Sequence, residues 1–422
     1  MKDIITSVIS TKTFSQSAIS FGGTFINGVL GFIFYILIAR YLGTANFGIF
    51  SICITATTLL TSIANIGVDT GLIRFVGKHI NNDKEKALKF LKLGLKIKII
   101  SFLTIYILGW LLLPFICKTI LLKPELISPL RFSLLGIGTA LLFSFATSSV
   151  QAMQRFWVWS GLNIFANATR LLSLIILFSL GLVSIHTGLA VYIIFPLLGF
   201  FLGLLFLPNF WKAKNEKEIL PEFFKYNQWI LMSTILVAIS TRLDTFMSTR
   251  LLSLSEVGIY SVAVSLAGVV PQIVNALATV VAPKLAGFNK NEQVVRYLIK
   301  LQLFVSVLAV LGLLLGIPLA RFIIPAFYGH VYISSFSPFV VLLLAQAIFL
   351  VSIPVHSAVF YYFAHPKLFV WVSVVNILII GLVGWPLISS FGLMGAAWTV
   401  LFGNVSNFII PGIWVLNKFK KI

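Results

Sequence analysis

One arginine and two asparagines share an apolar stretch and form the best candidate site for chemistry in this sequence. Arg170 lies near the middle of the apolar run 159–181, and Asn163 and Asn167 precede it at spacings of four and three residues. On a helix these spacings place the three side chains on one face. A charge in so apolar a run usually faces a cavity or a partner. The functional interpretation is an anion contact, and the alternative is structural pairing with a carbonyl or a carboxylate.

Three further charged residues lie within or at the end of apolar runs. Arg242 and Asp244 fall in the run 227–249, and residues two apart do not face each other on a helix. Each therefore needs its own partner: one could serve a substrate and the other an ion or a proton, with a structural network as the alternative. Asp69 ends another run and is the second candidate for ion coupling. A position at the membrane interface is the favoured explanation for Asp69.

Signatures of other chemistry are missing from the sequence. It contains no GxxxxGK[ST], HExxH or GxSxG motif, and its two cysteines, Cys53 and Cys117, form no ligand pattern. We therefore expect no enzyme activity, no metal and no cofactor. Energy for any transport would have to come from an ion gradient, a substrate gradient or the membrane potential.

The composition indicates an integral membrane protein. Hydrophobic residues make up 59% of the 422 residues and charged residues only 10%, where a soluble domain carries about 25% charged residues. The net charge of +20 would also suit a partner such as nucleic acid. The charges, however, lie in short clusters between apolar runs, the pattern of a membrane protein with basic cytoplasmic loops. We therefore expect membrane lipids, and no nucleic acid, as partners.

Twelve apolar runs are long enough to cross a bilayer, which takes about 20 residues. We predict an all-α protein with six spans in each half. The spans of the first half are 16–39, 47–72, 97–117, 129–152, 159–181 and 188–208. Those of the second half are 227–249, 257–281, 301–320, 336–360, 368–387 and 393–416.

Lys and Arg are distributed unequally between the two sides of these spans. Most of the 31 basic residues fall on the side of the N-terminus, which places both termini in the cytoplasm of a multi-pass protein of the cell (inner) membrane. Two of the basic segments, 78–98 and 284–300, mix Lys with Leu, Ile and Val at helical spacing. We expect both to lie along the anionic inner leaflet.

A motif that occurs twice indicates a duplicated half. Residues 40–51 are echoed by residues 250–261, and weaker matches follow in the same order. Identical pairs in the motif are Arg40/Arg250, Leu42/Leu252, Gly48/Gly258, Ile49/Ile259 and Ser51/Ser261. We predict two six-helix bundles, an N-terminal lobe 1–215 and a C-terminal lobe 216–422. Because six is even, both halves enter from the same face, as in two-lobed carriers.

The motifs resemble those of one transporter family. Arg40-Tyr-Leu-Gly-Thr-Ala-Asn-Phe-Gly-Ile-Phe-Ser51, Gly67-Val-Asp-Thr-Gly-Leu-Ile-Arg-Phe75 and Arg242-Leu-Asp244, followed by Glu256-Val-Gly-Ile-Tyr-Ser261, are similar to the polysaccharide transporter (oligosaccharide flippase) family. That family belongs to the multidrug/oligosaccharidyl-lipid/polysaccharide exporter superfamily. The resemblance covers essentially the whole chain and identifies the family better than the substrate.

This resemblance implies a V-shaped exporter fold and a substrate. The family flips undecaprenyl-linked sugars to the outer leaflet by alternating access, for O-antigen, capsule or other surface polysaccharide. A polyprenyl-linked oligosaccharide is the implied ligand, and a polysaccharide polymerase is left open as a partner. A diphosphate head suits the planar fork of arginine, so Arg170 and Arg242, with Asn163 and Asn167, are the expected substrate contacts. Asp244 and Asp69 are the expected ion-coupling acids.

Competing interpretations remain at this point. An ion-coupled drug or small-molecule exporter of the same superfamily would use Asp244 or Asp69 as its coupling acid. A membrane-embedded glycosyltransferase or polymerase would need a large external loop or a catalytic domain, and the loops here are short. The major facilitator architecture also has six plus six spans, but its basic signature after the second span is absent, since residues 78–84 stand there instead.

Overall fold

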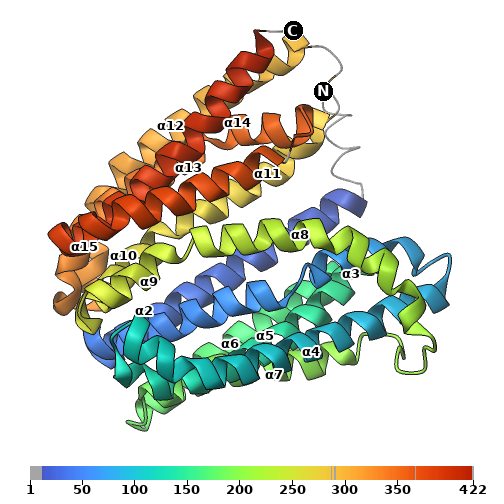
Figure 1. Cartoon of the computed structure of the whole chain (residues 1–422), viewed down its shortest axis with the longest axis horizontal. Coiled ribbons are helices and arrows are strands. Elements are labelled where there is room, and N and C mark those ends of the chain that lie inside the picture. Colours follow the sequence, from blue (N-terminus) through green and yellow to red (C-terminus); the bar gives the residue numbers. More distant parts are fainter. Residues whose placement is uncertain (1–11, 287, 289–290, 366, 421–422) are drawn as a thin grey trace. The chain divides into compact units, whose positions relative to one another are not determined.

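The computed structural model describes residues 12–286, 288, 291–365 and 367–420, and over these residues the chain is helical without a strand (Figure 1). The first helices are α2 (Lys12–Ala64), α3 (Val68–His79), α4 (Lys84–Phe115), α5 (Ile127–Ala152), α6 (Phe156–Ser179) and α7 (Ile185–Leu204). The later ones are α8 (Leu220–Ser240), α9 (Leu243–Leu251), α10 (Leu254–Ala267), α11 (Val269–Ala286), α12 (Asn291–Ile323), α13 (Phe336–Val351), α14 (Ile353–Ser357) and α15 (Lys367–Phe419). Short π or 3-10 turns are η1 (Ile116–Ile120), η2 (Pro124–Leu126), η3 (Glu216–Ile219), η4 (Ile324–Tyr328), η5 (His330–Ser335) and η6 (Ala358–Tyr362).

Nine helical segments within the described part of the chain are long and apolar enough to cross a membrane. The protein is therefore a multi-pass membrane protein. Two of the nine, in α2 and α15, contain 46 and 53 residues, whereas a bilayer takes about 20. Each of these two is long enough to cross twice. The predicted total of twelve spans is compatible with this and stays a prediction.

Both long helices are interrupted by a glycine near the middle. Gly43 has φ 71° and ψ 174° in α2, and Gly392 has φ 56° and ψ −128° in α15. Residues with a side chain rarely adopt such backbone angles, so glycine is the residue expected there. Each break lies between two predicted spans, which are thus joined with almost no loop.

The chain divides into two compact units. Unit 1 comprises residues 1–41 and 53–235, and unit 2 comprises residues 42–52 and 236–422. In unit 1, α5 packs against α4 and α7, and α3 packs against α4 and α5. In unit 2, α13 packs against α12 and α15, and α9 packs against α15. The middle of α2 thus belongs to unit 2, although both of its flanks belong to unit 1.

A cluster of aromatic and aliphatic side chains forms the core of unit 1 at the start of α4. The ring of Phe75 in α3 stacks on that of Phe90 in α4 at 4.7 Å between centroids, and Phe223 of α8 lies 5.9 Å from both rings. All three side chains are buried. This core fixes α3, which carries Asp69, against α4.

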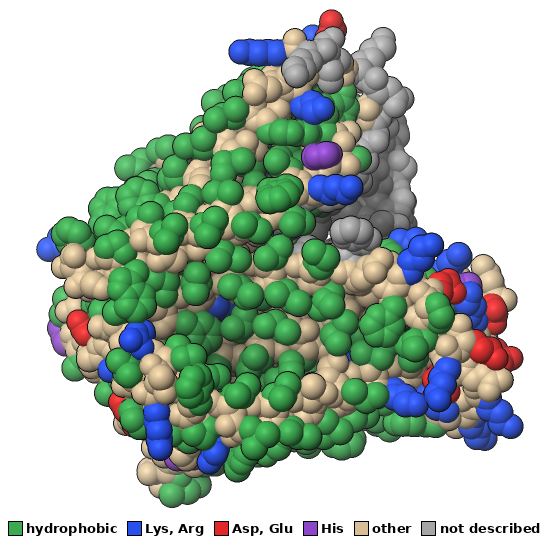
Figure 2. Space-filling view, viewed as in Figure 1, with side chains coloured by type: hydrophobic (Ala, Val, Ile, Leu, Met, Phe, Trp, Pro, Cys, Tyr) green, Lys and Arg blue, Asp and Glu red, His purple; other side chains and the backbone are tan. Residues whose placement is uncertain are grey.

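Charged side chains gather at the end of unit 1 where α4 begins, while hydrophobic ones cover the helices (Figure 2). The lysines of α4 lie against glutamates that come before and just inside α8. Ion pairs join Lys86 to Glu222 (2.9 Å), Lys89 to Glu218 (3.3 Å), and both Lys92 (3.6 Å) and Lys96 (3.5 Å) to Glu216. The sequence predicts that segment 78–98 lies along the inner leaflet. In the structure these lysines hold the connection between the two halves of the sequence, and the position of the segment along the leaflet stays a prediction.

Candidate functional site

The guanidinium group of Arg170 lies between two aromatic rings in unit 1. Its Cζ atom is 4.8 Å from the ring centre of Phe34 in α2 and 4.7 Å from that of Tyr192 in α7. Arg170 itself is on α6, so three helices meet at this group. Cation–π contacts of this kind are each worth about 0.5–2 kcal/mol. The two rings fix the orientation of the guanidinium plane.

A chain of asparagines leads to the same arginine. The Arg170 Nη2 atom donates a hydrogen bond to Oδ1 of Asn167, and Nδ2 of Asn167 donates to Oδ1 of Asn27 in α2. Asn167 Nδ2 also approaches the carbonyl of Asn163 at 3.2 Å, and Asn163 Nδ2 donates to the carbonyl of Trp159 at 2.8 Å. The structure therefore places Asn167 beside Arg170, whereas the side chain of Asn163 bonds to its own helix.

Arg170 has unused capacity for hydrogen bonding. Its Nε atom is buried and has no hydrogen-bond partner, and no ion pair to a carboxylate forms at Arg170 within the described residues. A buried donor without an acceptor costs about 1–3 kcal/mol. The arrangement is a half-buried cation held by neutral groups, which suits an incoming anion.

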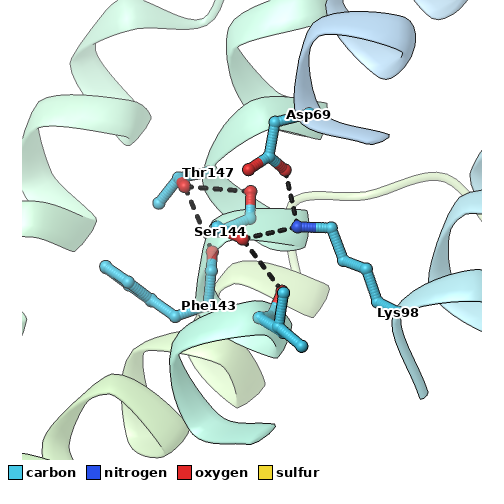
Figure 3. A network of polar contacts seen from close by, with 6 residues as sticks. Asp69, Lys98, Phe143, Ser144 and Thr147 are labelled. Atoms are coloured by element: carbon cyan, nitrogen blue, oxygen red, sulfur yellow. Dashed lines mark hydrogen bonds and ion pairs between the residues drawn. The ribbon is translucent and has the colours of Figure 1, made fainter. Parts of the chain in front are cut away.

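A second buried cation in unit 1 is already paired (Figure 3). Lys98 of α4 donates from Nζ to Oδ1 of Asp69 at 2.6 Å and also to Oγ of Ser144 in α5. The Lys98 side chain has no exposed area, and Asp69 retains 23%. Ser144 in turn donates to the carbonyl of Leu141 at 3.0 Å. Asp69 therefore lies in an ion pair that ties α3 to α4 and α5.

A backbone turn places Asp69 at the beginning of a helix. Ile66 (φ 49°) and Gly67 (φ 70°) adopt left-handed conformations after α2 ends, and α3 then begins at Val68. Asp69 thus occupies the first turn, where the helix dipole favours a negative charge. Its role in ion coupling stays a prediction.

In unit 2, Asp244 is also in the first turn of a helix. Asp244 of α9 is 7% exposed, accepts a hydrogen bond from the hydroxyl of Tyr260 in α10 at 2.9 Å, and contacts Oγ1 of Thr245 at 3.5 Å. No Lys, Arg or His lies within ion-pair distance of it in the described ranges. Hydroxyls and the backbone N–H of Thr245 thus hold this buried carboxylate. A carboxylate in such a neutral setting is suited to taking up a proton or a small cation.

Arg242 lies at the interruption between α8 and α9. Its backbone has φ −128° and ψ −6°, its N–H donates to the carbonyl of Ile239, and its own carbonyl accepts from Phe246. The side chain is half-buried and is not within ion-pair distance of Asp244, as the two-residue spacing predicts. Arg242 belongs to unit 2 and Arg170 to unit 1, so the two form separate candidate contacts.

Several residues of these sites escape sequence reasoning. Phe34, Tyr192 and Tyr260 lie on different helices from the residues they contact, and the sequence does not distinguish them from its many other aromatic residues. Lys98 is predicted with the basic surface cluster, although its neighbours Leu95, Ile97, Ile99 and Ile100 are apolar. A lysine flanked so closely by apolar residues is the one sign of its burial.

The fold and these charges define a class of protein, the multi-pass helical membrane protein that is built of two units and carries ionisable residues within its apolar helices. The structure is similar to an inward-facing multidrug resistance MATE family transporter of the MOP superfamily, with 10% identity, a TM-score of 0.79, and coverage of 96% of this chain and 98% of that one. It is also similar to the lipid II flippase MurJ in an inward closed conformation, with 17% identity, a TM-score of 0.75, and coverage of 94% and 87%. These likenesses show the fold.

The family follows from the sequence. Residues 15–289 match the family model described as polysaccharide biosynthesis protein, and the chain belongs to that family. No curated protein matches the chain. The family and the exporter fold together support a transporter or flippase rather than an enzyme.

Proposed function

We propose that the protein flips a polyprenyl-diphosphate-linked oligosaccharide from the inner to the outer leaflet of the cell membrane by alternating access, for surface polysaccharide biosynthesis. Both termini then lie in the cytoplasm, and O-antigen or capsule assembly is the expected pathway type. A polysaccharide polymerase would consume the product. The family supports the link to polysaccharide, and the similarity to MurJ supports a lipid carrier only by analogy, since that protein is named for lipid II.

The observation that carries the proposal is the environment of Arg170. A diphosphate needs a cation that is not already neutralised, and Arg170 is held by Asn167 and two rings instead of a carboxylate. Its Nε–H has no acceptor, so a phosphate oxygen would supply one. Charge-assisted hydrogen bonds of this kind are worth about 1.5–3 kcal/mol each.

The other proposed contacts have separate roles. Arg242 is the expected cationic substrate contact in unit 2. Asn167 orients Arg170 by direct contact, and the backbone carbonyl of Asn163, one helical turn earlier, accepts a hydrogen bond from Asn167. Asp244 is the proposed ion-coupling acid. Asp69 is the second, but its pairing with Lys98 means that coupling through it would have to break that ion pair.

A second candidate function rests on Asp244. A carboxylate that is buried among hydroxyls is also what an ion-coupled drug or small-molecule exporter would use to bind a proton or cation. In that case a cationic or neutral compound would replace the lipid-linked sugar, and Arg170 would have a structural role only.

Reconstitution in liposomes separates the two functions. A fluorescent polyprenyl-diphosphate oligosaccharide is loaded, and flipping is scored by quencher access. Arg170→Ala should slow flipping about tenfold or more, because one charge-assisted contact of about 1.5–3 kcal/mol is lost. Arg131→Ala is the matched control, since Arg131 also stacks on a ring, that of Trp110 at 4.5 Å, and bonds to a carbonyl.

The outcomes are distinct. Slow flipping by Arg170→Ala with normal flipping by Arg131→Ala supports the diphosphate contact. Equal rates in the wild type and Arg170→Ala, or equal losses in both variants, would remove Arg170 as a substrate contact. Export of a small molecule without flipping of the lipid-linked sugar would favour the second function.

A further inference from the structure

A half-buried histidine joins three helices of unit 2. His356 of α14 has its Nε2 atom 2.8 Å from the backbone carbonyl oxygen of Asn407 in α15. Its ring lies edge to face with the ring of Phe369 in α15, at 4.9 Å between centroids, and with that of Phe349 in α13, at 6.2 Å. The imidazole therefore links α14 to α13 and to α15.

Pro411 explains why α15 accepts this hydrogen bond. In an α-helix a carbonyl accepts from the N–H four positions later, and the residue four positions after Asn407 is Pro411, inside α15. Proline has no N–H, and its ring pushes against that carbonyl, so the carbonyl of Asn407 is left without its helical donor. Neighbouring helices can satisfy backbone groups that a proline frees within a membrane. His356 supplies such a donor.

The two ring nitrogens of His356 have different partners. A carbonyl oxygen only accepts, so Nε2 carries a hydrogen. Nδ1 lies 3.5 Å from Oγ of Ser352, but that hydroxyl donates its one hydrogen to the carbonyl of Phe349 at 2.7 Å. Among the described residues, Nδ1 thus keeps a lone pair that no donor fills, beside an oxygen that can accept a hydrogen bond.

The surroundings of His356 supply no countercharge. The segments packed against α14 are α11, α12, α13, α15 and η6, and α13 has no titratable side chain. Those of the other four form no ion pair or hydrogen bond with His356 within the described ranges. They are Lys284 in α11, Glu292, Arg296, Tyr297, Lys300 and Arg321 in α12, Tyr361 and Tyr362 in η6, and Lys367 and Lys418 in α15. A charge on His356 would therefore depend on its hydrogen bonds alone.

From these contacts we infer that His356 is a proton-binding site that fastens α14 to α15 where Pro411 interrupts the hydrogen bonds of that helix. A proton from water adds to the lone pair of Nδ1, which then donates to Oγ of Ser352. The ring becomes a cation, and its bond to the carbonyl of Asn407 becomes charge-assisted, about twice as strong as a neutral one. The link between α14 and α15 is thus tighter in acid than in base.

This site is separate from the proposed substrate contacts. In the predicted orientation, His356 lies near the inner end of the predicted span 336–360, where protons would arrive from the cytoplasm. It belongs to unit 2, as Asp244 does, but it has no contact with Asp244 among the described hydrogen bonds and ion pairs. The inference holds whichever substrate the protein carries.

Nuclear magnetic resonance of the full chain in lipid nanodiscs, with ¹⁵N in the histidine rings, tests the protonation state. The signals of His356 are those that His356→Gln lacks. At about pH 8 they should show a hydrogen on Nε2 only, and Nδ1 should gain one on acidification to about pH 4, which spans the ordinary range of histidine. A hydrogen on Nδ1 at pH 8, or no change over this range, would overturn the site.

Two proline variants test the link to α15 in the same spectra. Pro411→Ala returns an N–H donor to the carbonyl of Asn407, so His356 should no longer keep its hydrogen on Nε2 alone. Pro386→Ala is the matched control, because Pro386 also lies inside α15 but is not placed against His356. The same result in both variants would contradict the role of Pro411.

Hydrogen exchange tests whether the proton tightens the helix. Exchange of the amides 408–419, corrected for intrinsic rates, should slow about fivefold as His356 gains its proton, because a charged donor replaces a neutral one. His356→Gln keeps a donor for Asn407 but cannot titrate, so its exchange should not respond to acid. His365→Gln is the control, since His365 is exposed and stacks on Trp414 in the same region, and it should respond as the wild type does.

The outcomes separate this site from the proposed function. An acid response that persists in His356→Gln, or one that is absent from the wild type although His356 titrates, would overturn the fastening. Neither readout needs a substrate, so a protein that shows both effects but does not flip the lipid-linked sugar would support the proton site and contradict the proposed substrate.

Discussion

Lys98 and Asp69 form an ion pair at 2.6 Å in which the lysine side chain is fully buried and the aspartate remains 23% exposed. The two partners therefore depend on the pair to different degrees. We therefore expect water to hydrate the carboxylate when the lysine is removed, and we expect the buried ammonium group to stay without water when the aspartate is removed. Within the residues that the structure describes, the Ser144 hydroxyl is the other hydrogen-bond partner of Lys98.

This asymmetry predicts unequal effects of the two single substitutions. Breaking a buried ion pair by removing one partner costs about 3–5 kcal/mol, because it leaves an uncompensated charge. Asp69→Asn should therefore lower the free energy of unfolding more than Lys98→Met. Thermal unfolding in detergent measures both. The double variant should be more stable than Asp69→Asn alone, and a double variant whose loss equals the sum of the single losses would contradict a coupled pair.

Asp244 should control the dependence of transport on an ion gradient. Asp244→Asn keeps the shape of the side chain and removes its charge. A coupling free energy of 1–3 kcal/mol corresponds to a change of about 5- to 150-fold, and this stimulation by an imposed proton or sodium gradient should disappear in the variant. Transport into liposomes with and without each gradient measures it. Stimulation that is unchanged in Asp244→Asn would exclude Asp244 as the coupling acid.

Tyr260→Phe is the companion variant for Asp244. It removes the 2.9 Å hydrogen bond to the carboxylate but keeps the charge. The gradient dependence should remain, although the concentration of ion or the pH at half stimulation should shift.

The connection before α8 should loosen in acid. A hydrogen bond from its own backbone amide, joined by the charges of Lys92 and Lys96, lowers the pKa of the Glu216 carboxyl despite partial desolvation. A lowered pKa in the folded state stabilises the fold above the unfolded value, which is about 4.3 for Glu. This contribution is lost as the pH falls from there through the lowered pKa. Hydrogen exchange at residues 212–219, corrected for intrinsic rates, should rise over that range.

Glu216→Gln provides the comparison for this acid effect. The neutral side chain cannot pair with Lys92 or Lys96, so exchange at the connection should already be fast at neutral pH and should change less on acidification. An acid response of the same size in Glu216→Gln would assign the effect to another group.

Gly43 should not tolerate a side chain, although there is space for one. A Cβ at Gly43 would meet nothing within 4 Å, but the backbone angles of φ 71° and ψ 174° are reserved almost entirely for glycine. Gly43→Ala should therefore lower the free energy of unfolding by about 1–3 kcal/mol. Gly31→Ala in the same helix, with equal space and no positive φ, should be neutral or stabilising by up to about 1 kcal/mol. Equal melting temperatures of the two variants would contradict this strain.

The spacing of residues in the sequence predicts contacts between side chains of the same helix, but few contacts between different helices. The contact of Arg170 with Asn167 follows from their separation of three residues on one helix. Arg242 and Asp244 do not pair either, but Arg242 lies at the interruption before α9, which the sequence does not reveal. The breaks between α2 and α3 and inside α2 lie at glycines that the sequence displays. These features depend on helical geometry, which is the same in every protein.

Contacts between helices are not readable in this way. Nothing in the sequence indicates that Phe34 and Tyr192 hold Arg170, or that Tyr260 reaches Asp244. The lysines of α4 illustrate the difficulty further: their spacing predicts an exposed basic face, yet Glu216 and Glu218 cover it from a segment more than a hundred positions later in the chain. Whether a basic helix face stays exposed or is covered by acidic residues therefore depends on the whole fold.

The break at Gly43 has a practical consequence for topology mapping. Because a single residue joins the two parts of α2, an epitope tag or protease site inserted there would disrupt both helices and would report on a damaged protein. The turn 180–184 between α6 and α7 is predicted to lie on the same face, and a Cβ at its Gly181 meets nothing within 4 Å. An insertion after Gly181 is the better reporter of which side of the membrane that face occupies.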